Sequence, residues 1–408
     1  MKLDDMPAVS PSIAVQPQSR AARMFLRLLG HLRVGRVDLI LPDGSAQAFD
    51  SGRAGPHAML RLSDWRVLDD LLRSGDIGFA EAYIDGRWDT QDLAILLTVA
   101  AVNYNELERA IHGRVWGWIA YRIRHLLRSN RKAQARRNIQ AHYDLGNAFY
   151  ALWLDQTMTY SSALFGADEG LGLEAAQAAK YERICATLDI RPWDRVLEIG
   201  CGWGGFAEHA IRTRGCRVDG VTLSSEQLVY ARERLAGAGL AEQAGFQLCD
   251  YRDIDGEYDH VVSIEMFEAV GESYWPAYFD AVRKALRRGG RALVQTITID
   301  DRQFARYRRG TDFIQQYIFP GGMLPSARVF AEQATRRGLR LGDTLAFGAD
   351  YGETLRRWRQ RFNRCVGELN AMGFDNRFIR LWNFYLAYCE AGFRAGNIDV
   401  MQLELVRD

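Results

Sequence analysis

The sequence has 408 residues, of which 48% are hydrophobic and 25% are charged, and its net charge is +1. This composition is typical of folded proteins and excludes a disordered chain; at ~150 residues per domain it suggests two or three domains. No apolar run approaches the ~18 residues of a membrane-spanning helix. Six cysteines in a chain of this length do not indicate a disulfide framework, and the absence of a Cys-x-x-Cys pair argues against a zinc ribbon. Asp4, Asp5 and Pro7 stand where a secretory signal would be basic and then apolar, so we expect a reduced, cytoplasmic protein.

The first part of the chain predicts a small α+β domain over residues 20–105. Residues 1–19 contain three prolines and little apolar periodicity, so a disordered tail is expected there. Short strands are predicted within residues 33–50, around a Pro-Asp-Gly turn. A helical region follows over residues 63–103, with Ser63 as its expected N-cap.

A basic linker helix is predicted over residues 106–137. From Arg109 to Arg137 the sequence holds nine basic residues, no acidic residue and two tryptophans. A basic amphipathic helix with aromatic side chains is typical of elements that lie on a membrane surface. A solvated linker that packs on its own domain is the alternative. Nucleic acid is not expected as a partner, because the sequence offers no further basic groove.

Residues 138–408 alternate strand-like and helix-like segments, which predicts a mostly parallel, doubly wound α/β sheet. The expected strands are 195–199, 217–222, 246–249, 260–264 and 292–297, and helices are expected from Trp203, from Ser224 and over 275–286. In such sheets ligands bind beyond the carboxyl ends of the strands. Functional residues are therefore expected at that edge.

The strongest local pattern is a glycine-rich turn that runs from Glu198 to Gly205, between an apolar strand and a helix. Glycines let the chain turn sharply and let a ligand touch the backbone. The run also satisfies Gly-x-Gly-x-x-Gly, and Asp219 lies where a dinucleotide-binding protein would hold a ribose. Glu198 argues against a dinucleotide, because a carboxylate at the strand end suits a cationic ligand and would repel a pyrophosphate. A structural turn without a ligand is the remaining alternative.

With these motifs the chain resembles the cyclopropane-fatty-acyl-phospholipid synthases, a family of S-adenosylmethionine-dependent lipid methyltransferases. The matching stretches are His142–Asn147, Tyr160–Ser162, Leu197–Gly205, Thr222–Gln227, Cys249–Arg252, Glu265–Gly271, Tyr317–Pro325 and Tyr388–Arg394, with a weaker match at Gly78–Gly86. The resemblance implies a Rossmann-like class I methyltransferase domain over residues 138–408, with a lipid-binding insertion around 300–325. Because the match extends into the N-terminal domain, it implies the two-domain form that acts on phospholipid-bound chains.

The resemblance also implies where S-adenosylmethionine, the methyl donor, binds. The implied donor-binding residues are Tyr160, Ser161, Glu198, Gly200, Cys201, Gly202, Trp203, Gly204, Thr222, Leu223, Ser224, Gln227, Tyr251 and Arg252. The family pattern favours Thr222 and Gln227 over Asp219 near the ribose. It implies no metal.

The chemistry that the resemblance implies is electrophilic. The double bond of an unsaturated acyl chain attacks the sulfonium methyl group, a carbocation forms on the chain, and loss of a proton from the new methyl group closes a cyclopropane ring. A bound bicarbonate is implied as the base. The implied catalytic positions are Ser162, Glu268, Gln295, the Ile297 backbone, Tyr351 and Cys389. The substrate would be an unsaturated phospholipid, reached by peripheral binding to the inner face of the membrane, and a homodimer is left open.

Three positions depart from the common bacterial pattern of that family. Ala269 and Gln295 stand where histidines are usual, and Ser162 stands where a cysteine is usual. A glutamine amide can still donate a hydrogen bond to an anion, so ring closure is not excluded. The product is left open between a cyclopropane ring and a methyl- or methylene-branched chain. A small-molecule methyltransferase and a non-enzymatic membrane scaffold are the other hypotheses.

Overall fold

The computed structural model describes residues 20–104, 106, 145–167 and 170–408. The chain divides into two compact units. The first lies within residues 1–124, 310–316 and 366–397, and the second within 125–309, 317–365 and 398–408. Two segments from the second half of the sequence therefore belong to the first unit, which no single cut along the chain would give. The expected tail at 1–19 and, apart from Glu106, the expected linker helix at 106–137 lie outside the described residues.

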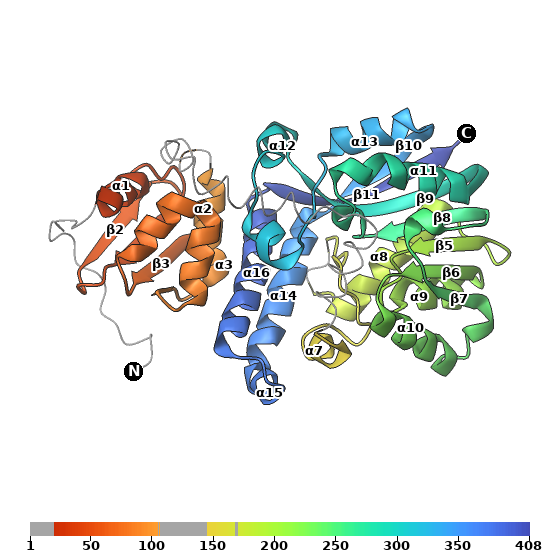
Figure 1. The fold of residues 1–408 in the computed structure, drawn as a ribbon, viewed down its shortest axis with the longest axis horizontal. Coiled ribbons are helices and arrows are strands. Elements are labelled where there is room, and N and C mark those ends of the chain that lie inside the picture. The colour runs from red at the N-terminus through yellow and green to blue at the C-terminus, as the bar shows by residue number, and fades with distance from the viewer. Residues whose placement is uncertain (1–19, 105, 107–144, 168–169) are drawn as a thin grey trace. The chain divides into compact units, whose positions relative to one another are not determined.

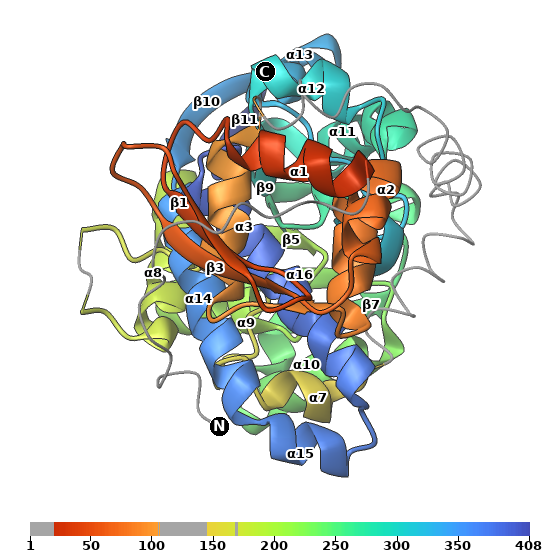
Figure 2. The ribbon, with the colours of Figure 1, turned by 90° about the vertical axis from the view of Figure 1, so that its left-hand side faces the viewer.

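The first unit contains a four-stranded sheet with the order β2-β1-β3-β4. Its elements are α1 (Arg20–Leu29), β1 (Arg36–Ile40), β2 (Ala46–Asp50), β3 (His57–Leu62), α2 (Arg66–Ile84), β4 (Trp88–Asp89), α3 (Leu93–Val102), α15 (Val366–Ala371) and α16 (Asn376–Arg394). Strand β1 is antiparallel to β2 and parallel to β3. Figure 2 shows this sheet together with α1, α2 and α3.

The helical region predicted over residues 63–103 contains α2 and α3, which are separated by β4. The prediction of Ser63 as its N-cap is wrong, because the N-cap position of α2 is Trp65. Helix α2 begins at Arg66, whose backbone N–H donates to the Asp64 side chain at 2.9 Å. Helix α3 begins after Asp92, whose side chain accepts from two N–H groups of the first turn. Each start is thus set by a carboxylate that accepts otherwise unpaired N–H groups.

The second unit contains a seven-stranded sheet with the order β10-β11-β9-β8-β5-β6-β7. Its strands are β5 (Arg195–Ile199), β6 (Arg217–Thr222), β7 (Ala244–Leu248), β8 (Tyr258–Ile264), β9 (Leu286–Ile299), β10 (Leu339–Ala346) and β11 (Ile398–Arg407). The neighbours from β7 to β9 are parallel, whereas β11 is antiparallel to both β9 and β10. The predicted parallel sheet is confirmed, and the antiparallel pair at one edge is an addition that the alternating pattern did not reveal.

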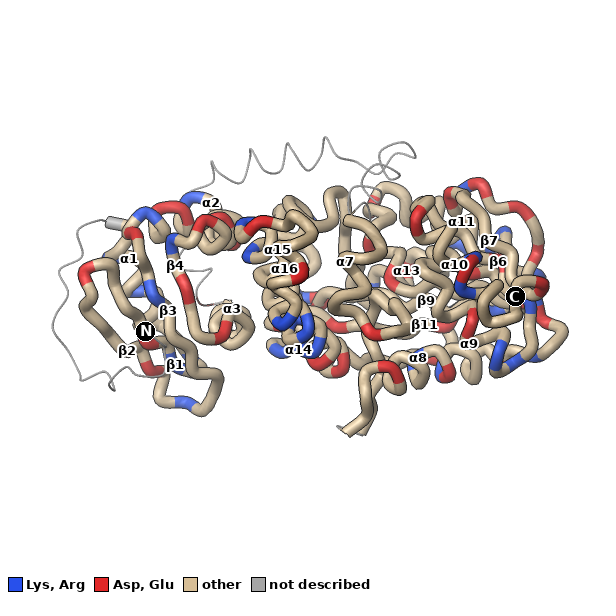
Figure 3. Tube along the Cα trace, turned by 90° about the horizontal axis from the view of Figure 1, so that it is seen from below, with Lys and Arg blue, Asp and Glu red and all other residues tan. Residues whose placement is uncertain are grey.

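Helices cover both faces of this sheet (Figure 1). The α-helices of this unit are α7 (Asn147–Ala151), α8 (Leu173–Leu188), α9 (Gly205–Arg214), α10 (Ser225–Gly237), α11 (Trp275–Ala285), α12 (Asp301–Tyr307), α13 (Ala327–Arg336) and α14 (Gly348–Arg364). A π-helix at Ile314–Ile318 begins in the first unit and ends in the second. Val196 belongs to the core that includes α8, α9 and α10, whereas its neighbour Leu197 belongs to the core that includes α11 and α13. Adjacent strand residues thus point to opposite apolar layers. Figure 3 shows basic residues along α14, whose sequence contains five arginines.

Candidate active site

Two carboxylates follow β8 at the carboxyl edge of the parallel strands. Glu265 comes directly after the strand, and Glu268 lies in the short 3-10 turn Phe267–Ala269. Glu265 has a left-handed backbone with φ 50°, a conformation that is strained for a residue with a side chain. Its N–H donates to the Gln295 carbonyl at 2.8 Å, which ties the turn to β9. Strained backbone of this kind clusters at functional sites.

Glu265 accepts hydrogen bonds from three different segments of the chain. Its Oε1 accepts from the Ser162 backbone N–H and from the Gln295 Nε2, both at 2.8 Å, and its Oε2 accepts from the Tyr351 hydroxyl at 2.6 Å. Burial raises the pKa of Glu265, while the charge of Lys180 and these donors oppose the rise. Hydrogen bonds donated to a carboxylate favour its charged form.

Glu268 has a different environment, although it lies only three residues away. Its Oε1 accepts from the Ile297 backbone N–H at 2.5 Å, whereas its buried Oε2 has no hydrogen-bond partner among the described residues. Burial raises the pKa of Glu268 to about 8, and the nearby charge of Glu265 contributes to the rise. The three donors favour the charged form of Glu265, whereas burial and the neighbouring charge favour the protonated form of Glu268, as expected for two buried carboxylates that interact.

The amide of Gln295 is oriented by a chain of hydrogen bonds. Gln402 on β11 pairs in register with Gln295 on β9, and its Nε2 donates to the Gln295 Oε1 at 3.0 Å. Arg183 donates in turn to the Gln402 Oε1 at 2.6 Å. Both glutamines are fully buried. With its oxygen occupied in this way, Gln295 presents its NH₂ group to Glu265.

The structure thus brings Ser162, Glu268, Gln295, Ile297 and Tyr351 together, as the sequence analysis expected. A bicarbonate held by Ser162, Gln295 and Tyr351 does not fit this arrangement, because the carboxylate of Glu265 already accepts their hydrogen bonds.

Cys389 belongs to α16 and to the first unit. Burial, with a smaller contribution from the charge of Asp312, raises the pKa of its thiol far above the ordinary range. Cys389 is therefore a neutral thiol at physiological pH and lacks the thiolate character of a nucleophile.

The glycine-rich turn after β5 offers a buried acceptor and open space. Glu198 is 3% exposed, and its Oε2 has no partner within the described part of the chain. Burial raises the pKa of Glu198 well above its ordinary value. A Cβ built on Gly202, which has φ 50°, would meet nothing within 4 Å, whereas one on Gly200 would meet Met266 at 3.0 Å. An acceptor without a partner beside open backbone suits a ligand that carries hydroxyl groups.

A buried lysine lies beside this turn. Lys180 on α8 is fully buried, and its Nζ donates to the Ser161 Oγ at 2.5 Å. Burial lowers the pKa of Lys180 to about 7, while the charges of Glu265, Asp155 and Glu198 oppose the shift. Lys180 therefore places a titratable charge between the Glu265 site and the Glu198 site.

The residues expected after β6 form a local network. The Thr222 Oγ1 donates to the Gln227 Oε1 at 3.0 Å, and Ser224 caps α10 by accepting from the Gln227 N–H at 3.3 Å. Leu223 between them is half-buried. Asp219 lies earlier on β6 and pairs with Arg195 at 2.9 Å, so it takes no part in this network.

The other expected donor-binding residues lie in the same unit. Tyr251 and Arg252 form the short turn after β7, where Arg252 is held by Asp250 through two hydrogen bonds of 2.7 Å. Cys201 and Gly204 belong to the turn after β5, where Cys201 is buried and Gly204 is the N-cap of α9.

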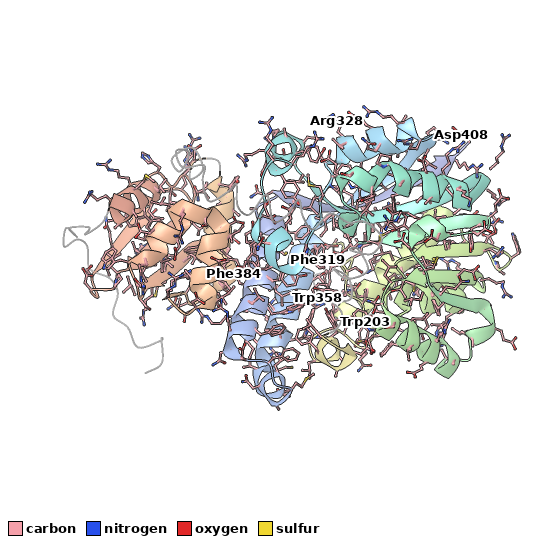
Figure 4. All side chains as sticks on the ribbon, in the orientation of Figure 1. Trp203, Phe319, Arg328, Trp358, Phe384 and Asp408 are labelled. Carbon is pink, nitrogen blue, oxygen red and sulfur yellow. The ribbon has the colours of Figure 1, made fainter. Side chains whose placement is uncertain are left out.

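Aromatic rings connect the donor-binding residues to the carboxylate site. The Tyr160 ring lies 5.4 Å from that of Trp358, which lies 6.1 Å from Tyr351. Trp203 packs 5.1 Å from Tyr150, and its Nε1 donates to Asn147 at 2.7 Å. Figure 4 shows Trp203 and Trp358 among the side chains of this unit. Aromatic faces of this kind can stabilise a nearby cation.

The sheet order, the glycine-rich turn and the buried acid near the end of β5 define a class I S-adenosylmethionine-dependent methyltransferase. Residues 130–403 match the family described as mycolic acid cyclopropane synthetase. The chain belongs to this family, and its activity is S-adenosylmethionine-dependent methyl transfer to lipids.

Relatives and solved structures agree with this assignment. The chain is 40% identical to the tuberculostearic acid methyltransferase UfaA1 of Mycobacterium tuberculosis, over 99% of this chain and 96% of that protein. It is 35% identical to the cyclopropane-fatty-acyl-phospholipid synthase of Escherichia coli K12, over 86% of this chain and 88% of that protein. The mycolic acid cyclopropane synthase CmaA1, solved in complex with SAH and CTAB, is 31% identical and superposes with a TM-score of 0.62, covering 67% of this chain and 98% of that structure.

The residues present fit the methyl donor. Glu198 would supply a buried acceptor for ribose hydroxyls, and the open backbone at Gly202 would allow the ligand to approach closely. Thr222, Gln227 and Tyr160 would complete its surroundings. When bound, S-adenosylmethionine supplies an electrophilic methyl group on a cationic sulfur.

Sequence reasoning missed Glu265, Lys180 and Gln402 as site residues. Glu265 could have been noticed as a second carboxylate at the end of β8, one turn before Glu268. Lys180 stands out only as a lysine on a helical face that is apolar apart from Gln177. Gln402 gives no local signal, because its role arises from its pairing with Gln295 across two strands.

The open space at Gly202 predicts a selective loss of donor binding. In Gly202→Ala the new methyl group should occupy the ligand's space, and donor affinity should fall at least ~10-fold, or ~1.4 kcal/mol. The left-handed backbone should cost ~1–2 kcal/mol of stability. Gly239→Ala is the matched control, because Gly239 has φ 72° and equally open surroundings but lies after α10. Calorimetric titration and chemical unfolding measure the two effects, and equal donor affinity in both variants would refute this interpretation.

The buried Lys180 predicts a pH-dependent stability. Its pKa is lowered from 10.5 to about 7 in the folded chain, so between these values the unfolded state binds the additional proton. Stability should therefore rise with pH over this window, by at most ~1.4 kcal/mol per pH unit. Lys180→Met removes the titrating group and should show a flatter profile. Urea unfolding at pH 7 and pH 9 gives the comparison, and parallel profiles would contradict the assignment.

Proposed function

We propose that the protein transfers a one-carbon unit from S-adenosylmethionine to the double bond of an unsaturated fatty acyl chain on a membrane phospholipid, and that a cyclopropane ring is formed. The observation that carries this proposal is the buried Glu265–Glu268 pair near the donor-binding residues. Methyl transfer to an alkene ends with the loss of a proton, which requires a positioned acceptor. Methyl transfer to an oxygen or nitrogen nucleophile would not need an acceptor aimed at carbon-bound hydrogen.

The proposed reaction balances around the acyl chain. The π electrons of the alkene form a bond to the transferred carbon, the electron pair of the carbon–sulfur bond stays on sulfur, and the adjacent chain carbon becomes a cation. Loss of a proton from the new methyl group releases an electron pair that closes the ring. Ser162 and Gln295 are fully buried, which supports a site from which water, a competing nucleophile for the cation, is excluded. The Tyr160 and Trp358 rings offer faces that stabilise positive charge.

A branched product is the second candidate, and a specific observation favours it. The relative with 40% identity over nearly the whole chain is named for a branched fatty acid. If a hydride first shifts from the methylated carbon to the cationic carbon, loss of a proton from the new methyl group gives a methylene branch (C=CH₂) in place of a ring. The two products have the same composition, because each adds one CH₂ unit to the acyl chain.

Lipid analysis tests the proposal. Expression in a host that lacks such an enzyme should yield phospholipid acyl chains heavier by one CH₂ unit, and Gly202→Ala should yield none. Proton NMR of the isolated fatty acids distinguishes the CH₂ group of a cyclopropane ring from the C=CH₂ group of a methylene branch. Methionine with a deuterated methyl group should leave two deuterium atoms in either product. Unchanged lipids, together with methylation of a polar small molecule by the purified protein, would instead support a small-molecule methyltransferase.

We also propose that the protein reaches its substrate by binding the cytoplasmic membrane surface peripherally. Among the described residues no helix combines the length and the apolar character needed to cross a bilayer. The basic stretch 109–137 lies outside the described residues, but its sequence supports attraction to anionic headgroups. Each arginine near such a surface contributes ~1 kcal/mol.

Charge reversal tests this surface. Replacing Arg124, Arg128 and Arg131 by Glu should weaken sedimentation with anionic liposomes, and added salt should weaken binding of the unmodified protein, because the Debye length falls to ~3 Å at 1 M. Reversal of Lys284, Arg287 and Arg288, three exposed residues at the end of α11 and the start of β9, is the matched control. Liposome binding that is indifferent to both the first triple variant and salt would eliminate the basic stretch as the docking element.

A further inference from the structure

We propose that the carboxylate of Glu265 is the proton acceptor of the reaction and that it stands in place of a bound bicarbonate. This inference rests on the proposed function, because it concerns the proton lost after methyl transfer. Its basis is the set of hydrogen bonds that converge on one side chain.

The hydrogen-bond donors that would hold a bicarbonate are already occupied. Family resemblance gives Ser162, Gln295 and Tyr351 to bicarbonate, yet all three donate to Glu265, at 2.8, 2.8 and 2.6 Å. A carboxylate and a bicarbonate share a planar O–C–O group, so the same donors suit either. The side chain supplies that group from within the protein, already oriented and without the entropy cost of capturing a free anion.

A second negative charge at this buried site is electrostatically unfavourable. A bicarbonate near Glu265 would bring a second negative charge into a buried site whose three donors are engaged. Two positions that the resemblance gives to the anion remain, Ile297 and Glu268, and they are bonded to each other, because the Ile297 N–H donates to the Glu268 Oε1. A buried anion without its own donors is strongly disfavoured. The described residues therefore provide for one anion, and that anion is Glu265.

The backbone at Glu265 is strained, which indicates that its position is held by the surrounding structure. Its φ of 50° is one of three positive φ values found at non-glycine residues in the described chain. The conformation is maintained by the hydrogen bond from its N–H to the Gln295 carbonyl and by the three donors to its side chain. Gln402 adds support, because its Nε2 donates to the Gln295 Oε1 at 3.0 Å and so orients the Gln295 amide. Gln402 is thus a positioning residue, and Glu265 is the group that would meet the reacting hydrogen.

The proposed step is balanced. One oxygen of Glu265 forms a bond to a proton of the new methyl group. The electron pair of the broken C–H bond forms either the new ring bond of a cyclopropane or the C=C double bond of a methylene branch. The carboxylate becomes a carboxylic acid and afterwards releases the proton to solvent. Glu268 is less suited to this role, because a single donor contacts its carboxyl group and its buried Oε2 has no partner among the described residues, which favours its protonated form.

The test compares dependence on bicarbonate with dependence on Glu265. Purified protein is assayed on unsaturated phospholipid vesicles, in buffer purged of carbon dioxide under argon and in the same buffer with added bicarbonate. The unmodified protein should give equal rates in both. Glu265→Gln, which keeps the size and removes the charge, should lose about 100-fold or more of the rate. Glu257→Gln, a change at an exposed position before β8, is the matched control and should keep full activity.

Glu265→Gly supplies the decisive arm. Glycine relieves the left-handed backbone and leaves Ser162, Gln295 and Tyr351 without their acceptor. Activity should then be low in purged buffer and should rise with added bicarbonate or formate, a rescue that the unmodified protein does not show. Calorimetric binding of the methyl donor confirms that each variant is folded.

Two results would overturn the inference. One is a rate of the unmodified protein that collapses in purged buffer and returns with bicarbonate, and the other is near-normal activity of Glu265→Gln. If the unmodified protein forms no one-carbon lipid product under any of these conditions, the proposed function fails instead, and that outcome is recognised before any variant is compared.

Discussion

The site depends on one constraint: a negative charge buried in the protein must be surrounded by donors. Glu265 meets this constraint with groups from three separate segments, and one of those groups, the Gln295 amide, is itself fixed by a further hydrogen bond. Ser162 contributes its backbone N–H, Gln295 an amide oriented by Gln402, and Tyr351 a hydroxyl from α14. Removing any one of these donors would leave the others holding a less well-compensated charge. The geometry of the site is therefore set by electrostatics as much as by apolar packing.

The same constraint separates the two carboxylates in function. Glu265 and Glu268 lie three residues apart, but one has three donors to its carboxylate and the other has one. Burial raises the pKa of both, and the charge on the first further raises that of the second. A turn of the chain thereby places two carboxyl groups in environments that favour opposite protonation states. The distinction comes entirely from which elements surround each side chain.

Much of the fold could be predicted because its signals are local. Alternating strand and helix patterns predicted the parallel strands of the second unit, and the glycine-rich pattern predicted the turn between β5 and α9. Ser63 was predicted wrongly because a helix start depends on which side chain can reach the first N–H groups, and Asp64 does so. The pair β10 and β11 was missed because its antiparallel pairing joins segments far apart in the sequence.

The candidate site shows the same division. Glu268, Gln295 and Tyr351 could be named from the family resemblance, but the carboxylate that accepts from both Gln295 and Tyr351 was not named. Glu265 becomes the centre of the site only through long-range hydrogen bonds, and Gln402 becomes a supporting residue only through strand register. Lys180 has no motif of its own, since its lowered pKa follows from burial between elements. Sequence therefore identified which residues meet in the site but not what they bind there.

The position of β11 has a consequence for the order of folding. This strand comes about a hundred residues after β9 in the sequence, yet it lies between β9 and β10 and carries Gln402 opposite Gln295. Pairings between distant segments form late, because closing a long loop costs entropy before any contact compensates for it. The parallel strands and the glycine-rich turn can form from a continuous stretch of chain as it emerges, whereas the amide that supports Glu265 cannot be locked in place until β11 has inserted. A nascent chain would thus acquire its donor-binding turn first and its organised carboxylate last, so that a partly folded molecule could hold the methyl donor before it could complete the chemistry.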